Sequence, residues 1–129
     1  MGSCPAVFSS MPAGASQGQD PAGWADHGWI DLVIPMDYQM QSLQVRSNER
    51  QFLTAMSDDD KLVTGLSLYM RSSGEVLSRP PELLLDQIEL VRRMGIHGYC
   101  LFALGHMSDE QLEALRETAN PEGAKPFFR

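Results

Sequence analysis

The chain has 129 residues, of which 43% are hydrophobic and 21% are charged, and its 17 acidic and 10 basic residues give a formal net charge of −7. This composition suits one globular domain, and the length excludes both two ordinary domains and a complete (β/α)8 barrel of roughly 250 residues. Because the acidic balance comes without any run of lysine or arginine, we expect no nucleic-acid partner.

The first half of the chain predicts two strands and two helices. An apolar strand at 5–10 is followed by a flexible loop at 11–20 and a short helix at 21–27, which has an aspartate to cap it, a proline at its first position and a glycine at its end. A second strand occupies 29–38, and a helical pattern follows it at 48–56.

The second half repeats this alternation. The apolar segment 61–70 predicts a strand, and the helix at 80–94 begins with two prolines, carries an apolar stripe and ends at a glycine. A last strand at 98–104 precedes a helix whose start has the pattern of a capping box at Ser108–Gln111. All four strand segments are apolar almost throughout, which is typical of a parallel sheet covered on both faces.

The spacing of the strands is that of βα units with right-handed crossovers. Four such units are half of an eight-unit barrel, so we predict an α/β fold: a (βα)4 half of a TIM-type barrel, with parallel strands in the order 1-2-3-4 and one domain over 1–129. An open doubly wound sheet is the alternative. That fold usually carries a glycine-rich turn after its first strand, and this chain has no GxGxxG motif, so we predict no nucleotide cofactor.

The histidines and cysteines of the sequence give no sign of a metal site or a disulfide framework. His27, His97 and His106 lack metal-ligand spacing, so no metal is predicted. Cys4 and Cys100 form no disulfide framework, and we expect both thiols to be reduced, with Cys100 buried in a strand. No apolar run approaches the roughly 20 residues of a membrane span, and no signal peptide is recognisable, so we expect no membrane partner and a cytoplasmic location by default.

Three motifs follow one another in the order found in a known family. The block D-x-V-x-P-M-x-Y stands at Asp31–Tyr38, V-x-G-L-x-x-Y at Val63–Tyr69, and L-x-x-Q-I with its later arginine, glycines and Leu-Phe pair at 84–102. With them, the chain resembles the C-terminal half of the bacterial family-10 glycosyl-hydrolase-like (β/α)8 barrels. The resemblance implies strands five to eight of such a barrel and a glycan-directed protein, acting on polysaccharide or peptidoglycan-type strands.

Four residues near predicted strand ends are candidates for the site. Asp37 is the only carboxylate at a predicted strand end and is the candidate catalytic residue, with a solvated loop or capping aspartate as the alternative. Tyr38, Tyr69 and His106 are candidate substrate-binding residues, with packing at the rim of the core or a plain loop position as the alternatives. Phe102 is expected to pack in the barrel core.

Two further carboxylates are interpreted as structural. Asp31 lies near the start of its strand, where we expect a hydrogen-bonding role, and Glu75 is expected to be a solvated loop residue.

Glycoside hydrolysis usually needs two carboxyl groups on either side of the scissile bond. The leading hypothesis is therefore a glycosyl-hydrolase-like half barrel that is inactive or weak by itself. The alternatives are a non-catalytic glycan-binding or assembly module and a small doubly wound α/β protein.

A half barrel also predicts self-association. The strands 5–10 and 98–104 would lie at unpaired sheet edges, beside an apolar concave face. A homodimer that rebuilds eight strands would remove both features, and its interface would be large and mostly apolar. The rival is a monomer whose edges are covered by the loop at 11–20 and by the C-terminal tail.

Overall fold

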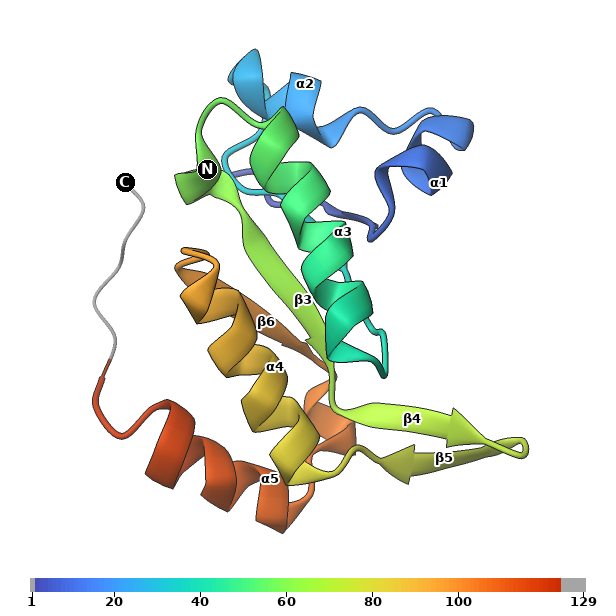
Figure 1. Cartoon of the computed structure of the whole chain (residues 1–129), viewed down its shortest axis with the longest axis vertical. Coiled ribbons are helices and arrows are strands. Elements are labelled where there is room, and N and C mark those ends of the chain that lie inside the picture. Colours follow the sequence, from blue (N-terminus) through green and yellow to red (C-terminus); the bar gives the residue numbers. More distant parts are fainter. Residues whose placement is uncertain (1, 124–129) are drawn as a thin grey trace.

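A four-stranded parallel sheet organises the molecule, for which a computed structural model describes residues 2–123 (Figure 1). Its strands are β1 (Ala6–Phe8), β2 (Ile34–Met36), β3 (Val63–Ser67) and β6 (Gly98–Phe102), in the spatial order β1-β2-β3-β6. Every neighbouring pair is parallel. The predicted order 1-2-3-4 and the half of a TIM-type barrel are therefore confirmed, and the doubly wound alternative is wrong because the strand order never reverses.

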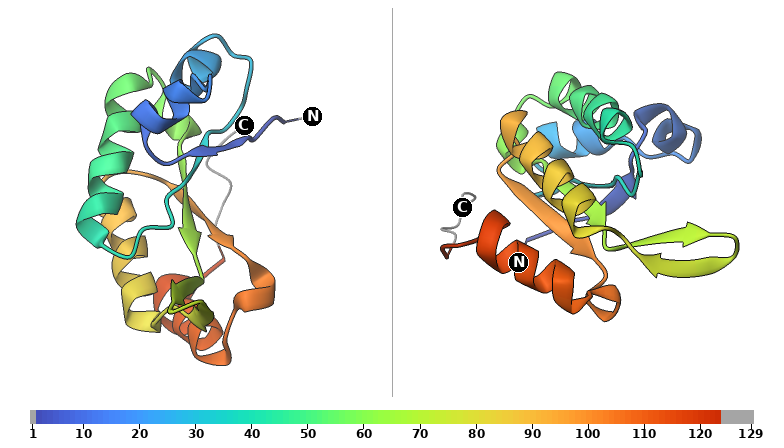
Figure 2. Two further views of the ribbon diagram at one scale, coloured as in Figure 1. Left: turned by 90° about the vertical axis from the view of Figure 1, so that its right-hand side faces the viewer. Right: turned by 60° about the horizontal axis from the view of Figure 1, so that its bottom comes forward.

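Helices alternate with these strands. They are α1 (Met11–Ser16), α2 (Pro21–Asp26), α3 (Ser42–Ala55), α4 (Pro81–Arg93) and α5 (Asp109–Ala114), which continues as a π-helical turn (Leu115–Ala119). The predicted capping box forms at the start of α5, where Ser108 and Gln111 each bond the other's backbone. The two long helices, α3 and α4, lie on one side of the sheet (Figure 2). No helix within residues 2–123 combines the length and hydrophobicity that a membrane span requires.

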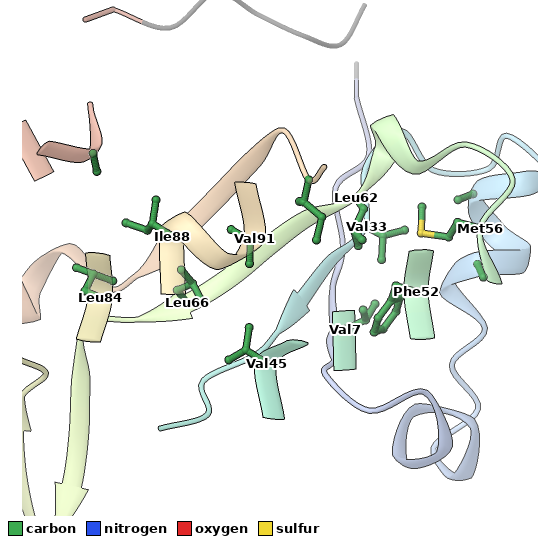
Figure 3. Close-up of a cluster of buried hydrophobic side chains, with 14 of the residues drawn as sticks. Val7, Val33, Val45, Phe52, Met56, Leu62, Leu66, Leu84, Ile88 and Val91 are labelled. Atoms are coloured by element: carbon green, nitrogen blue, oxygen red, sulfur yellow. The ribbon is translucent and has the colours of Figure 1, made fainter. Parts of the chain in front are cut away.

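The hydrophobic core lies between the sheet and these two helices (Figure 3). Phe52 of α3 is fully buried beside sheet residues, and α4 contributes the stripe Leu84, Ile88 and Val91, which are at most 1% exposed. Each such side chain stabilises the fold by about 1.5–3 kcal/mol relative to an exposed one. The stripe on α4 is the one that the sequence pattern predicts.

The opposite, concave face of the sheet carries exposed side chains at its two edge strands, whereas Val63 and Ser67 of the central strand β3 are buried. Side chains alternate along each strand, so those that do not enter the core point to this face. Phe8 is 41% exposed and Phe102 is 47% exposed here, and Cys100 is also exposed. The expectation of a buried Cys100 is therefore wrong, because its strand is covered on one face only.

Several element boundaries also differ from the prediction, and the strands predicted at 5–10 and 29–38 shorten to β1 and β2. The segment 11–20 is not a loop throughout, because α1 occupies Met11–Ser16, with a proline in its first turn and Met11 packed against the core. Helix α3 begins at Ser42, earlier than predicted, because Val45 extends the buried side of the helix by one turn.

The predicted strand at 61–70 divides into two elements. Strand β3 ends at Ser67, whose hydroxyl donates to the carbonyl of Tyr69 (2.8 Å) and accepts from its N–H (3.2 Å). The chain then leaves the sheet as an antiparallel hairpin, β4 (Tyr69–Ser72) and β5 (Glu75–Ser78), which projects outward in Figure 1. Its Ser73-Gly74 turn has positive φ at both residues, which suits the twist of a tight hairpin.

A close approach between β2 and β3 generates a stability prediction. A Cβ at Gly65 would lie 2.6 Å from the carbonyl oxygen of Pro35 on the neighbouring strand. We expect Gly65→Ala to lower the free energy of unfolding by about 1–3 kcal/mol, because the strands must separate to accept the methyl group. The control is Gly105→Ala, where a Cβ meets no atom within 4 Å. Chemical denaturation of both variants measures the difference, and equal stabilities would contradict the prediction.

Candidate functional site

Four aromatic rings gather where the parallel strands end. The rings of Tyr38 and Phe102 stack at 5.5 Å between centroids and are 13° from parallel. Tyr69 lies 6.3 Å from Phe102 and 4.7 Å from His106. We call these four residues the aromatic cluster. The structure therefore brings together the three predicted binding residues and adds Phe102 to them.

The topology explains why residues so far apart in sequence meet. Tyr38 follows β2, Tyr69 follows β3, and Phe102 ends β6, and the carboxyl ends of parallel strands share one edge of the sheet. The N–H of Leu68 donates to the carbonyl of Phe102 (2.8 Å), which joins the ends of β3 and β6 directly. His106 is added by a single 3-10 turn at Leu104–His106, immediately after β6.

Two shallow pockets flank Tyr69. One, of about 270 Å³, lies between the hairpin and the segment 105–108, and includes His106 in its lining. The other, of about 220 Å³, lies towards Tyr38 and Arg71. No carboxylate lines either pocket. A larger apolar groove of about 720 Å³ lies between α1 and α3, among helix residues and not at the strand ends.

Asp37 lies behind the sheet and is fully buried, so the interpretation as a solvated aspartate is wrong. One of its carboxylate oxygens accepts a hydrogen bond from Nδ2 of Asn48 on α3 (2.9 Å). Burial raises the pKa of Asp37 to about 6, although Asn48 and the charge of Arg79 act in the opposite direction. The structure thus separates Asp37 from the pockets beside the aromatic cluster, and its catalytic role stays a prediction.

Glu49 is a buried titratable residue that the sequence analysis did not identify. It is fully buried on α3, facing Asp37 and Thr64. Burial first, and then the nearby charge of Asp37, raise the pKa of Glu49 to about 8. At neutral pH, Glu49 therefore keeps its proton beside the ionised Asp37. The available signal was its position four residues after Val45 and three before Phe52, on the apolar stripe of the helix.

Arg79 was also missed, and it holds the backbone beneath the aromatic cluster. Its guanidinium, in a side chain only 1% exposed, donates to the carbonyls of Tyr38 (3.0 Å) and Gln39 (3.2 Å) and to Oε1 of Gln87 (2.8 Å). Gln87 in turn donates to the carbonyl of Gln39 (2.8 Å). The segment after β2 is thus fixed to the end of the hairpin and to α4.

Gln111 extends this network to α5. Its side-chain amide is fully buried and donates to the carbonyls of Leu68 (2.7 Å) and Arg79 (2.8 Å). These bonds hold both ends of the hairpin, which carries Tyr69. Buried polar groups need partners, so loss of any member would leave others unpaired.

The two carboxylates interpreted as structural lie outside the aromatic cluster. Asp31 accepts a hydrogen bond from the N–H of Ser3 (2.7 Å), which is the predicted kind of role. Glu75 is exposed at the tip of the hairpin, as predicted for a solvated residue, although it begins β5. Among residues 2–123, no group of histidine, cysteine and carboxylate side chains is arranged to hold a metal ion.

The parallel strands in sequential order, with helices on one face, define half of a TIM-type barrel. In agreement, the structure is similar to that of a chitinase from Chromobacterium violaceum ATCC 12472, with a TM-score of 0.66 and 14% sequence identity. The alignment covers 91% of this chain and 54% of the chitinase, so the chain spans about half of that protein's length. No family model and no curated protein matches the sequence. The fold of this chain is therefore similar to that of the chitinase, and the fold alone is what this likeness shows.

The buried carboxyl pair predicts how stability depends on pH. Because the folded-state pKa values of Asp37 and Glu49 are raised to about 6 and about 8, the folded state binds more protons than the unfolded state. Stability should therefore be greatest near pH 4 and fall as the pH rises through 8, by on the order of 1 kcal/mol per pH unit for each titrating group. Thermal unfolding from pH 4 to 9 measures this fall.

The variant Glu49→Gln should flatten the upper part of this dependence, because the amide replaces the proton donor and cannot ionise. Glu113→Gln, at an exposed position on α5, is the matched control and should keep the wild-type slope. A wild-type protein whose stability rises between pH 6 and 8 would contradict the raised pKa values of Asp37 and Glu49.

Proposed function

We propose that the aromatic cluster binds carbohydrate and that the chain is a glycan-directed, glycosyl-hydrolase-like half barrel. The observation that carries this proposal is the stack of Tyr38 on Phe102, with Tyr69 and His106 beside it, at the strand ends of the half barrel. The apolar faces of sugar rings pack on aromatic rings, and tyrosine hydroxyls and imidazole nitrogens can bond the sugar hydroxyls. Ligand sites of barrel enzymes lie at this same edge.

The geometry favours binding over catalysis by the chain alone. Hydrolysis needs a carboxylic acid and a second carboxylate about 5–10 Å apart on either side of the glycosidic bond. The described pockets beside the aromatic cluster have no carboxylate in their lining, and the Asp37–Glu49 pair is buried behind the sheet. A relationship to the family-10 glycosyl-hydrolase-like proteins would fit the D-x-V-x-P-M-x-Y block, in which Tyr38 is the last residue.

Binding is tested with a defined oligosaccharide. We expect N-acetylglucosamine tetramer, the probe suggested by the chitinase fold, to shift the NMR signals of Tyr38, Tyr69 and His106. We also expect Tyr69→Ala to weaken binding at least tenfold, because it removes the ring between the two pockets. The matched control is Trp29→Ala. Trp29 is 68% exposed and pairs with His27, away from the aromatic cluster.

Equal losses in Tyr69→Ala and Trp29→Ala would show that binding is not located at the aromatic cluster. Absence of any shift with the tetramer and with a peptidoglycan-type disaccharide would reject glycan binding. Circular dichroism of each variant confirms that the comparison is made between folded proteins.

The isolated chain should release no product from a chromogenic chito-oligosaccharide above the rate without protein, because the accessible strand edge lacks a pair of carboxyl groups. If turnover is measured, Asp37→Asn should lower kcat by orders of magnitude. Turnover that survives this substitution would remove Asp37 as the catalytic residue.

A further inference from the structure

The concave face of the sheet is suited to contact a second copy of the same chain. The side chains that β1, β2, β3 and β6 direct to it are all uncharged. Phe8, Cys100 and Phe102 are exposed there. A chain with a net charge of −7 repels its own copies over most of its surface. Two concave faces can approach each other without placing like charges in contact.

Both edges of the sheet offer free backbone groups in compatible positions. The carbonyls of Ser3 and Pro5 accept from the N–H groups of Asp31 and Ile34, so the intervening Cys4 directs its own N–H and C=O to the outer edge. On the other edge, the carbonyl of Phe102 accepts from the N–H of Leu68 and so points to β3. The preceding residue of β6, Leu101, therefore directs its N–H and C=O to the outer edge. The outward-facing positions of both edges carry no charged residue, and Pro5 directs its carbonyl to β2 and not to the outer edge.

We propose that two copies of the chain close one eight-stranded barrel, with β6 of each copy paired in parallel with residues 2–6 of the other. A twofold axis along the barrel generates both seams at once. The hydrogen bond from the N–H of Phe8 to Oε1 of Gln19 (3.0 Å) covers the edge only beyond residue 6 and leaves the seam free. This interface goes beyond the proposed carbohydrate binding and shares Phe102 with the aromatic cluster.

The register of the sheet defines which residues meet at the seam. A row perpendicular to the strands runs through Phe8, Met36, Gly65 and Cys100. The strands of a TIM-type barrel are tilted, so a row followed once around the barrel reaches its first strand again about eight residues before the residue where it began. A row followed around half of the barrel is therefore displaced by about four residues. The row that passes from Phe8 to Cys100 therefore reaches the second copy at its Cys4.

This register has a chemical consequence. Cys4 and Cys100 are the two cysteines of the chain, and both are free and exposed. Paired residues on neighbouring strands lie about 5 Å apart, within the range of a disulfide bridge. Within one copy the two thiols lie on opposite edges of the sheet, with β2 and β3 between them. They can meet only across a seam between copies.

The closed barrel would also bring the aromatic clusters of the two copies to the same end of the barrel. All eight strands would point the same way, so the aromatic clusters of both copies would lie around one opening. The second copy would supply four further strands beside the part of the fold that is similar to 54% of the chitinase.

Light scattering on a size-exclusion column tests the assembly. We expect a mass near twice the 14.3 kDa of one chain. Cys100→Glu should reduce it to that of one chain, because it places two carboxylates inside the barrel. Leu43→Glu is the matched control, since Leu43 is 77% exposed on α3, and this variant should remain dimeric. A mass near 14.3 kDa at every concentration would overturn the proposal.

Thiol oxidation tests the register. Treatment of the reduced protein with diamide should give a covalent dimer on a non-reducing gel, and mass spectrometry should find Cys4 joined to Cys100. Cys4→Ser and Cys100→Ser should each abolish this dimer, because every bridge needs both thiols. A dimer linked through Cys4 alone, or one that survives in Cys100→Ser, would overturn the proposed seam. So would a bridge within one chain.

Discussion

The architecture of the candidate site depends on one buried guanidinium. Arg79 directs its N–H groups to the backbone carbonyls of Tyr38 and Gln39, just after β2, and Gln87 of α4 also donates to the second of them. The oxygens that follow a parallel strand have no ladder partner, and burying them unpaired would cost about 1–3 kcal/mol each. Arg79, Gln87 and Gln111 supply the missing donors and so let the chain turn tightly beneath the aromatic cluster.

The charge of this arginine also explains why two carboxyl groups can be buried nearby. Asp37 is near enough for Arg79 to favour its ionised form. Glu49 stays protonated first because it is buried, and then because Asp37 would repel a second negative charge there. One cation, one anion and one neutral acid together carry no net charge. Buried charges are tolerated when they are balanced in this way. Oδ2 of Asp37, both carboxyl oxygens of Glu49 and Nε of Arg79 are nevertheless buried without a hydrogen-bond partner among the described residues. The polar layer thus joins β2, α3 and the hairpin within an otherwise apolar core.

Sequence patterns predicted the repeated βα units, the strand order and the gathering of Tyr38, Tyr69 and His106, because these follow from local periodicity and from the common direction of parallel strands. They did not predict the depth at which Asp37 is buried, since depth depends on which helix packs over the strand end. Glu49 and Arg79 were missed for a related reason. Each is charged, so a hydropathy pattern assigns it to the protein surface. The partners that allow its burial come from elements distant in sequence and cannot be identified from that pattern.

The hairpin β4–β5 stands apart from these constraints. It pairs only with itself in the sheet ladders, and all four residues of β5 are exposed. Its two ends are fixed by Gln111 and by the N–H of Arg79, which donates to the carbonyl of Leu68 (2.9 Å). Everything beyond that anchored base, including the Ser73-Gly74 turn, can change in length or composition while the barrel framework keeps its geometry. The hairpin is thus a natural position for engineering a longer or differently charged wall beside Tyr69.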